Sequence, residues 1–92
     1  MKVAEEWFTC TVGWVGPASD STDGTNPVIY IILDDKAGSF ANQWFFAADN
    51  AKTEMLAVAL MARSLNRPVA ADLDVPNPGG VPYTQINRLY LT

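Results

Sequence analysis

The feature that most constrains this chain is an unbroken apolar run, MLAVALMA from Met55 to Ala62, inside a predicted helix over Asp49 to Asn66. The helix of an isolated domain normally needs a single apolar stripe about 100° wide. An apolar run of this length covers every side of a helix. A chain of 92 residues cannot easily surround a helix on all sides. Part of this surface is therefore expected to meet another copy of the chain.

The composition is that of one globular domain over residues 1–92, because 49% of the residues are hydrophobic and 11% are aromatic, which excludes disorder. The apolar run is far shorter than the roughly 18 to 20 residues of a membrane span. No span is expected. The N-terminal stretch MKVAEEWF carries two glutamates where a secretory signal would carry its apolar core, so no signal peptide is visible. We expect a cytoplasmic protein, or a secreted one whose leader has been removed.

The charges and the missing residue types exclude several function classes. Ten acidic and six basic residues give a net charge of −4, which repels phosphate backbones, so nucleic acid is not an expected partner. The chain has no histidine, the usual general base and the commonest metal ligand. Its one cysteine, Cys10, has no partner for a thiol-protease or zinc site and is expected to be a small buried hydrophobe. We therefore predict no catalytic residue, no metal, no cofactor and no enzymatic activity.

Local patterns predict five strands and one helix in the order β-β-β-α-β-β. The strands are expected at Trp7–Val15, Val28–Asp34, Phe40–Ala48, Val69–Asp74 and Ile86–Thr92. The segments Gly16–Pro27 and Val75–Thr84 are rich in glycine and proline and are predicted to be loops. This element order is that of the OB-fold, a five-stranded Greek-key barrel, although other small α+β folds share it.

Strand alternation also predicts which side chains share a face. In the first strand, one face is expected to hold Phe8, Cys10, Val12 and Trp14, and the other Trp7, Thr9, Thr11 and Gly13. In the last strand, one face is expected to hold Ile86, Arg88 and Tyr90. At the helix ends, Asp49 or Asn50 is predicted to accept from the first-turn N–H groups, and Asn66 is predicted to take the left-handed conformation before Pro68.

Large aromatic side chains are numerous for so short a chain, which has three tryptophans and three tyrosines. Most of them are expected to fill the barrel or a subunit contact. An exposed aromatic face could instead stack on the C–H face of a pyranose while a nearby aspartate, asparagine or threonine bonds its hydroxyls. Trp7 and Tyr83 are the aromatic residues expected at the surface.

One long stretch of sequence suggests a family. The run WFFAADNAKTEMLAVALMARSLNRPVAADLD, followed by a Pro/Gly loop and YTQINRLYL, resembles the pentameric B subunits of AB-type bacterial toxins, and more closely the pertussis and subtilase types. The match covers residues 40–92. It implies an OB-fold homopentamer whose helices surround a central pore, which binds cell-surface glycans and delivers a catalytic A subunit.

The sugar-contacting residues of such subunits vary, and no motif carries them over to this chain position by position. In such a ring the central helix and subunit interface would be formed by Met55, Leu56, Ala59, Leu60, Met61 and Arg63. Besides Trp7 and Tyr83, three polar residues lie where contacts with a glycan would fall, namely Thr9, Asp34 and Asp72. Aspartate is also common at such positions for structural reasons alone, because Asp34 is expected at a turn and Asp72 on a solvated strand edge.

The leading hypothesis is a non-enzymatic, toxin-B-like homopentamer that binds carbohydrate. A structural or scaffolding oligomer of the same shape, whose ligand is a protein, is the alternative. A third hypothesis, an OB-fold for single-stranded nucleic acid, is disfavoured by the acidic balance of the chain.

Overall fold

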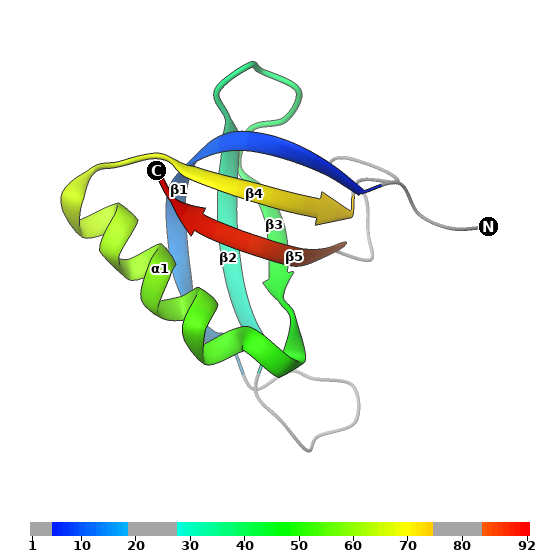
Figure 1. Ribbon diagram of the computed structural model, residues 1–92, viewed down its shortest axis with the longest axis vertical. Coiled ribbons are helices and arrows are strands. Elements are labelled where there is room, and N and C mark those ends of the chain that lie inside the picture. The colour runs from blue at the N-terminus through cyan, green and yellow to red at the C-terminus, as the bar shows by residue number, and fades with distance from the viewer. Residues whose placement is uncertain (1–4, 19–27, 75–83) are drawn as a thin grey trace.

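The chain folds into a five-stranded barrel closed at one end by a helix (Figure 1). The computed structural model describes residues 5–18, 28–74 and 84–92. The elements are β1 (Glu5–Ala18), β2 (Val28–Asp35), β3 (Gln43–Ala47), the 3₁₀ turn η1 (Asp49–Ala51), α1 (Lys52–Leu65), β4 (Val69–Asp74) and β5 (Thr84–Leu91). The strands close in the order β1-β2-β3-β5-β4. This is an OB-fold-like barrel, and the predicted mainly-β fold class is confirmed.

The long strand β1 makes closure possible because it belongs to both halves of the barrel. Its first part, up to Cys10, pairs antiparallel with β4, and its second part, from Cys10 to Ala18, pairs antiparallel with β2. Figure 1 shows β1 curving between these two neighbours. The remaining gap is closed by β3 and β5, which run parallel over Phe45–Ala47. The short connection between β2 and β3 forms the predicted antiparallel hairpin.

Alternate residues of each strand fill the interior. The largest fully buried apolar side chains are Phe45, Ile31, Leu33, Leu73, Ile86 and Val69. Cys10 is fully buried among them, as predicted for a small hydrophobe. Burial, followed by the charges of Asp35 and Asp34, raises the pKa of its thiol to about 12, so the thiol is protonated at neutral pH.

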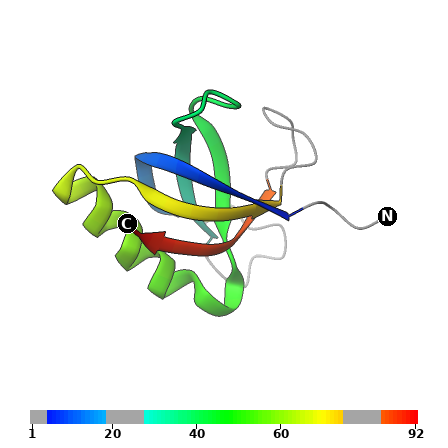
Figure 2. The same cartoon turned by 45° about the horizontal axis from the view of Figure 1, so that its top comes forward.

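The helix α1 covers one end of the barrel and packs chiefly against β1 and β5 (Figure 2). Its inward stripe consists of Met55, Ala59 and Ala62, spaced as expected for one face of a helix. The helix ends at Asn66, whose φ of 54° confirms the predicted left-handed residue. There the N–H of Arg67 donates to the carbonyl of Ala62 at 2.8 Å, which completes the cap.

The prediction for the start of the helix was wrong. No side chain caps it, because the chain enters α1 through the 3₁₀ turn η1. The carboxylate of Asp49 instead accepts from Lys52 Nζ at 3.3 Å. Both residues lie on the surface of the first turn, where the acidic residue still suits the helix dipole.

Two β-bulges correct the predicted strand faces. In β1, Val12 pairs with Leu33 and Val15 pairs with Ile31, so β1 takes one more residue than β2 between these pairs. Val15 packs on the core, whereas Trp14, predicted to share a face with the buried Cys10, is 73% exposed.

A second bulge lies in β5, where Asp72 pairs with Arg88 and Leu73 pairs with Ile86. Asn87 is the extra residue of this bulge. Ile86 therefore lies in the core. The prediction that it shares one face with Arg88 and Tyr90 was wrong, because those two side chains lie on the outer face.

Strand boundaries also differ from prediction. Residues 16–18 extend β1, although a loop was predicted there, because they pair with Val28, Ile29 and Tyr30. Phe40, predicted in a strand, lies in the connection before β3, where it is buried in edge-to-face contact with Phe45 at 5.4 Å. The remainder of the first predicted loop, residues 19–27, and nearly all of the second, residues 75–83, lie outside the described residues.

Candidate binding surface

Three of the predicted site residues meet on the outer face of β1, β4 and β5. The register places Trp7 of β1 opposite Asp72 of β4, and Thr9 opposite Ala70. On the other side of β4, Asp72 pairs with Arg88. Because alternate residues of a strand leave the sheet on the same side, these side chains project from one outer surface of the barrel.

An exposed pair of aromatic rings lies at one end of this surface. The ring centroids of Trp7 and Tyr90 are 5.6 Å apart, and the rings are tilted by 31°. The two residues come from strands on either side of β4, where Trp7 pairs with Asp72 and Tyr90 pairs with Ala70, so the rings meet diagonally across β4. Trp7 is 50% and Tyr90 55% exposed, so the paired rings present apolar area to solvent.

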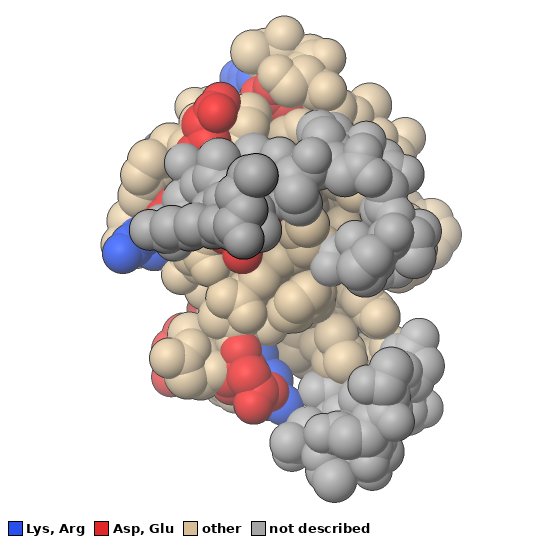
Figure 3. Space-filling model, turned by 90° about the vertical axis from the view of Figure 1, so that its right-hand side faces the viewer, with Lys and Arg blue, Asp and Glu red and all other residues tan. Residues whose placement is uncertain are grey.

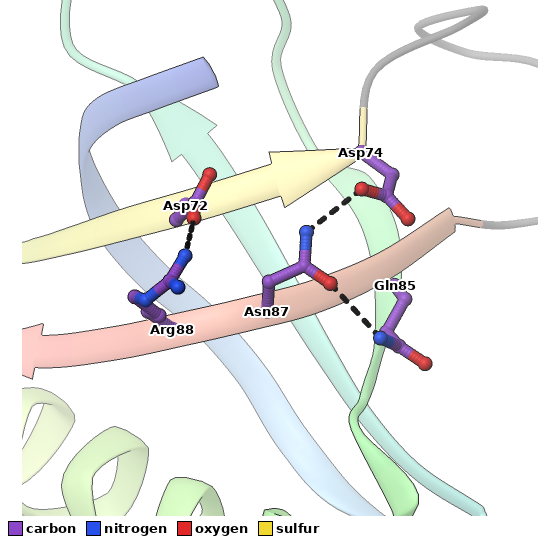
Figure 4. Close-up of polar contacts among 5 residues, drawn as sticks. All are labelled: Asp72, Asp74, Gln85, Asn87 and Arg88. Atoms are coloured by element: carbon purple, nitrogen blue, oxygen red, sulfur yellow. Dashed lines mark hydrogen bonds and ion pairs between the residues drawn. The ribbon is translucent and has the colours of Figure 1, made fainter. Parts of the chain in front are cut away.

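A buried carboxylate lies beside the aromatic rings. The side chain of Asp72 is only 3% exposed, and its Oδ2 accepts from Nη1 of Arg88, whose side chain is about half-exposed (Figure 4). Burying a carboxylate costs free energy unless its charge is paired, and Arg88 supplies the positive charge that balances Asp72. The predicted role of Asp72 in a ligand contact remains a prediction, and its observed partner is this arginine.

A row of polar side chains continues from the ion pair along β5. Asn87 Nδ2 donates to Asp74 Oδ1 at 2.7 Å, and Gln85 Nε2 donates to Asn87 Oδ1 at 2.9 Å (Figure 4). Asn87 is the extra residue of the β5 bulge, which places its side chain between its two polar neighbours. The row therefore carries carboxylate and amide groups held by one another before any ligand arrives.

Another predicted ligand residue, Asp34, is not part of this surface. Asp34 lies near the end of β2, where its Oδ1 accepts from the backbone N–H of Asn42. Asn42 has a φ of 50°, so this bond holds a left-handed residue in the β2–β3 connection. Tyr83 lies outside the described residues.

Arg88, Tyr90 and Asn87 were missing from the predicted site. The sequence held a signal for the first two, since alternation placed Arg88 and Tyr90 on one face of the last strand. What it lacked was the register that brings them next to Asp72 and Trp7. Asn87 gave no signal, because its placement depends on the bulge.

The helix residues predicted at a subunit interface divide into two groups. Met55 and Ala59 are buried in the core of their own barrel, and Leu56 packs partly against it. Leu60 and Met61 are half-exposed, as is Leu65 in the last turn of the helix. Arg63 is also exposed, and its guanidinium donates to the carbonyl of Gly13 in the β1 bulge.

Further aromatic side chains occur on β1, β2 and β3. Tyr30 and Trp44 make an edge-to-face contact with centroids 5.4 Å apart. Trp14, opposite β2, is the most exposed of the three tryptophans. Trp14 thus offers an exposed indole on β1 outside the Trp7–Tyr90 pair.

Within residues 5–18, 28–74 and 84–92, no three carboxylate or thiol side chains lie together as a metal-ion site would require. In the same part of the chain, no helix combines the length and apolarity needed to cross a membrane.

The fold and the surface together define an OB-fold-like barrel with an exposed aromatic pair beside a fixed polar row. No protein-family model, curated protein or solved structure matches the chain. The resemblance to toxin B subunits has no support from these comparisons and stays a prediction.

Proposed function

We propose that this chain is a non-enzymatic carbohydrate-binding protein whose ligand lies on the outer face of β1, β4 and β5. The observation that carries the proposal is the exposed Trp7–Tyr90 pair beside the polar side chains of β4 and β5. A sugar ring has an apolar C–H face, which complements an aromatic ring, and a rim of hydroxyls, which bond to amides and carboxylates. Specific sites commonly combine aromatic area with a few placed polar groups in this way.

The charges of this surface favour a sugar over nucleic acid. Asp74 lies on it beside the Asp72–Arg88 ion pair, whose charges balance, and the chain carries a net charge of −4. On the face drawn in Figure 3, the described surface is mostly uncharged, and isolated cations are interspersed with carboxylates. A nucleic-acid groove gains most of its affinity from a continuous row of cations along the phosphates.

A glycan array probed with the labelled protein tests the proposal, and a matched pair of tryptophan variants locates the site. We expect Trp7→Ala to weaken binding about tenfold or more, which corresponds to ~1.4 kcal/mol or more. Trp14→Ala removes an exposed indole from another part of β1 and should bind as the wild type does. Binding to no glycan, or equal losses in the two variants, would contradict the proposal.

The exposed side of α1 supports a second part of the proposal, assembly into a homo-oligomer. Leu60, Met61 and Leu65 are half-exposed on one short helix, and large apolar side chains gathered at a surface mark interaction sites. A ring of five copies and a catalytic A-type subunit are implied only by the resemblance to toxin B subunits.

The same helix surface favours one other candidate function, a scaffolding oligomer that binds a protein. The two candidates differ in what the β1–β4–β5 surface does. A stable oligomer that retains no glycan on the array would favour the scaffold.

A further inference from the structure

We infer that the β1–β4–β5 surface binds an uncharged oligosaccharide of at least two sugar rings, laid along β5. One end of the ligand stacks on Trp7 and Tyr90, and the other end bonds to the side chains of Gln85, Asn87 and Asp74. This inference rests on the proposed carbohydrate-binding function and specifies its ligand class.

The length of the surface sets the minimum size of the ligand. Tyr90 and Gln85 lie near the two ends of β5, five positions apart in the sequence. At the usual rise of a strand, this separation spans roughly 15 Å, slightly less with the bulge at Asn87. A single sugar ring is too short to stack on the aromatic pair and also reach the amide of Gln85. Both groups are used together only if the ligand continues from one ring to the next.

The charge of the surface disfavours an acidic sugar. The charge of Asp72 is balanced by Arg88, which holds it in an ion pair. Asp74 is bonded to the neutral amide of Asn87, which leaves its negative charge uncompensated by that bond. A sugar carboxylate at this end would therefore face a carboxylate on a protein that is acidic overall. Hydroxyl groups, which donate to Asp74 and accept from amide groups, suit the row better.

The polar row is arranged before the ligand binds. Asn87 bonds to both Asp74 and Gln85, so the three side chains restrict one another across β4 and β5. A ligand that bonds to a row already ordered loses less side-chain entropy on binding than one that must order it. Extending the ligand from the aromatic pair onto this row should therefore raise its affinity.

The test is calorimetric titration of the full chain with neutral oligosaccharides from monosaccharide to tetrasaccharide, built on the sugar that binds best on the array. Each is compared with its sialylated counterpart. We expect affinity to rise about tenfold or more between the monosaccharide and the trisaccharide. We expect the sialylated probes to bind more weakly than the neutral ones.

Two variants connect the length dependence to the polar row. Asn87→Ala removes the central amide and should remove the gain from added sugars. Gln85→Ala removes the distal amide without touching Asp74, so it tests the same point if Asn87→Ala fails to fold. Trp7→Ala should lower the affinity of every probe, whatever its length.

The outcomes separate this inference from the proposed function. If glycans bind but affinity is the same at every length, or if the sialylated probes bind best, the inference is overturned while carbohydrate binding stands. If no probe binds at any length, the proposed function itself fails and the inference fails with it.

Discussion

Asp35 shows how one side chain holds the connection between β2 and β3. Its Oδ1 accepts from the N–H of Ala37 at 3.2 Å, and its Oδ2 accepts from the N–H of Ser39 at 2.9 Å. Burial raises the pKa of this carboxyl, but the hydrogen bonds from Ser39 and Ala37 outweigh burial, and the net pKa lies below its ordinary value of 3.8. The charged form of Asp35 is therefore more stable in the folded chain than in the unfolded one.

Replacing this carboxylate should make stability depend on pH in a defined direction. Asp35→Ala should lower the free energy of unfolding by about 1 to 3 kcal/mol near neutral pH, because two N–H groups lose their acceptor. Since the folded pKa lies below the unfolded pKa, the contribution is complete above the unfolded pKa and is lost as pH falls through the folded pKa. Urea unfolding of both proteins over this range measures the difference. Lys36→Ala, an exposed neighbour, is the control. A deficit that stayed constant down to the lowest pH would contradict the role of the charge.

At the scale of residues, the sequence predicted the exposure of Trp7 but not the burial of Asp72 or its partner. Trp7 was expected at the surface, and it is exposed. Asp72 was expected on a solvated edge or in contact with ligand, yet it is buried and paired with Arg88. The two residues are 16 positions apart in the chain, and only the register of β4 against β5 brings them together. The sequence pattern within one strand cannot predict its register against another strand.

At the scale of elements, periodic patterns sufficed for the regular segments and failed at the irregular ones. The alternation of Val69–Asp74 predicted β4 with its observed bounds. The strand faces near Trp14 and Ile86 were wrong, because a bulge adds one residue and reverses the alternation beyond it. A bulge depends on the neighbouring strand, so a period of two in one strand cannot reveal it.

The end of α1 offers a test of an element whose cap was predicted from the sequence. Asn66 has a φ of 54°, which costs most non-glycine residues roughly 1 to 2 kcal/mol. Asn66→Ala should therefore destabilise the chain by about 1 kcal/mol, because asparagine tolerates this conformation better than alanine. Asn66→Gly, the matched variant, should be neutral or stabilising. Chemical denaturation monitored by circular dichroism measures both. If alanine and glycine had equal effects, the left-handed conformation would not be what stabilises this helix end.

At the scale of the whole molecule, the barrel shelters only part of the apolar helix. The run from Met55 to Ala62 predicted apolar area on every side of α1, and the structure buries one stripe of it, centred on Ala59. Leu60 and Met61 follow Ala59 directly and are half-exposed. The residues of α1 that build the core of the barrel therefore differ from those that the proposed assembly would bury.

Two adjacent substitutions separate folding from assembly. Ala59 is 0% and Leu60 is 49% exposed in the single chain. Ala59→Asp should unfold the barrel, because it places a charge without a partner in the core at a cost of several kcal/mol. Leu60→Asp should keep the strand and helix signals of circular dichroism, because its carboxylate stays in water, but it should dissociate the oligomer.

Native mass spectrometry and sedimentation of the wild type and both variants measure the assembly directly. The wild type should have a multiple of the 10.0 kDa subunit mass, and Leu60→Asp should have that mass alone. A wild type that is already monomeric would show that water covers this side of α1. A Leu60→Asp variant that assembles normally would instead move the contact to another surface of the chain. Only dissociation of a folded Leu60→Asp chain assigns the contact to the helix.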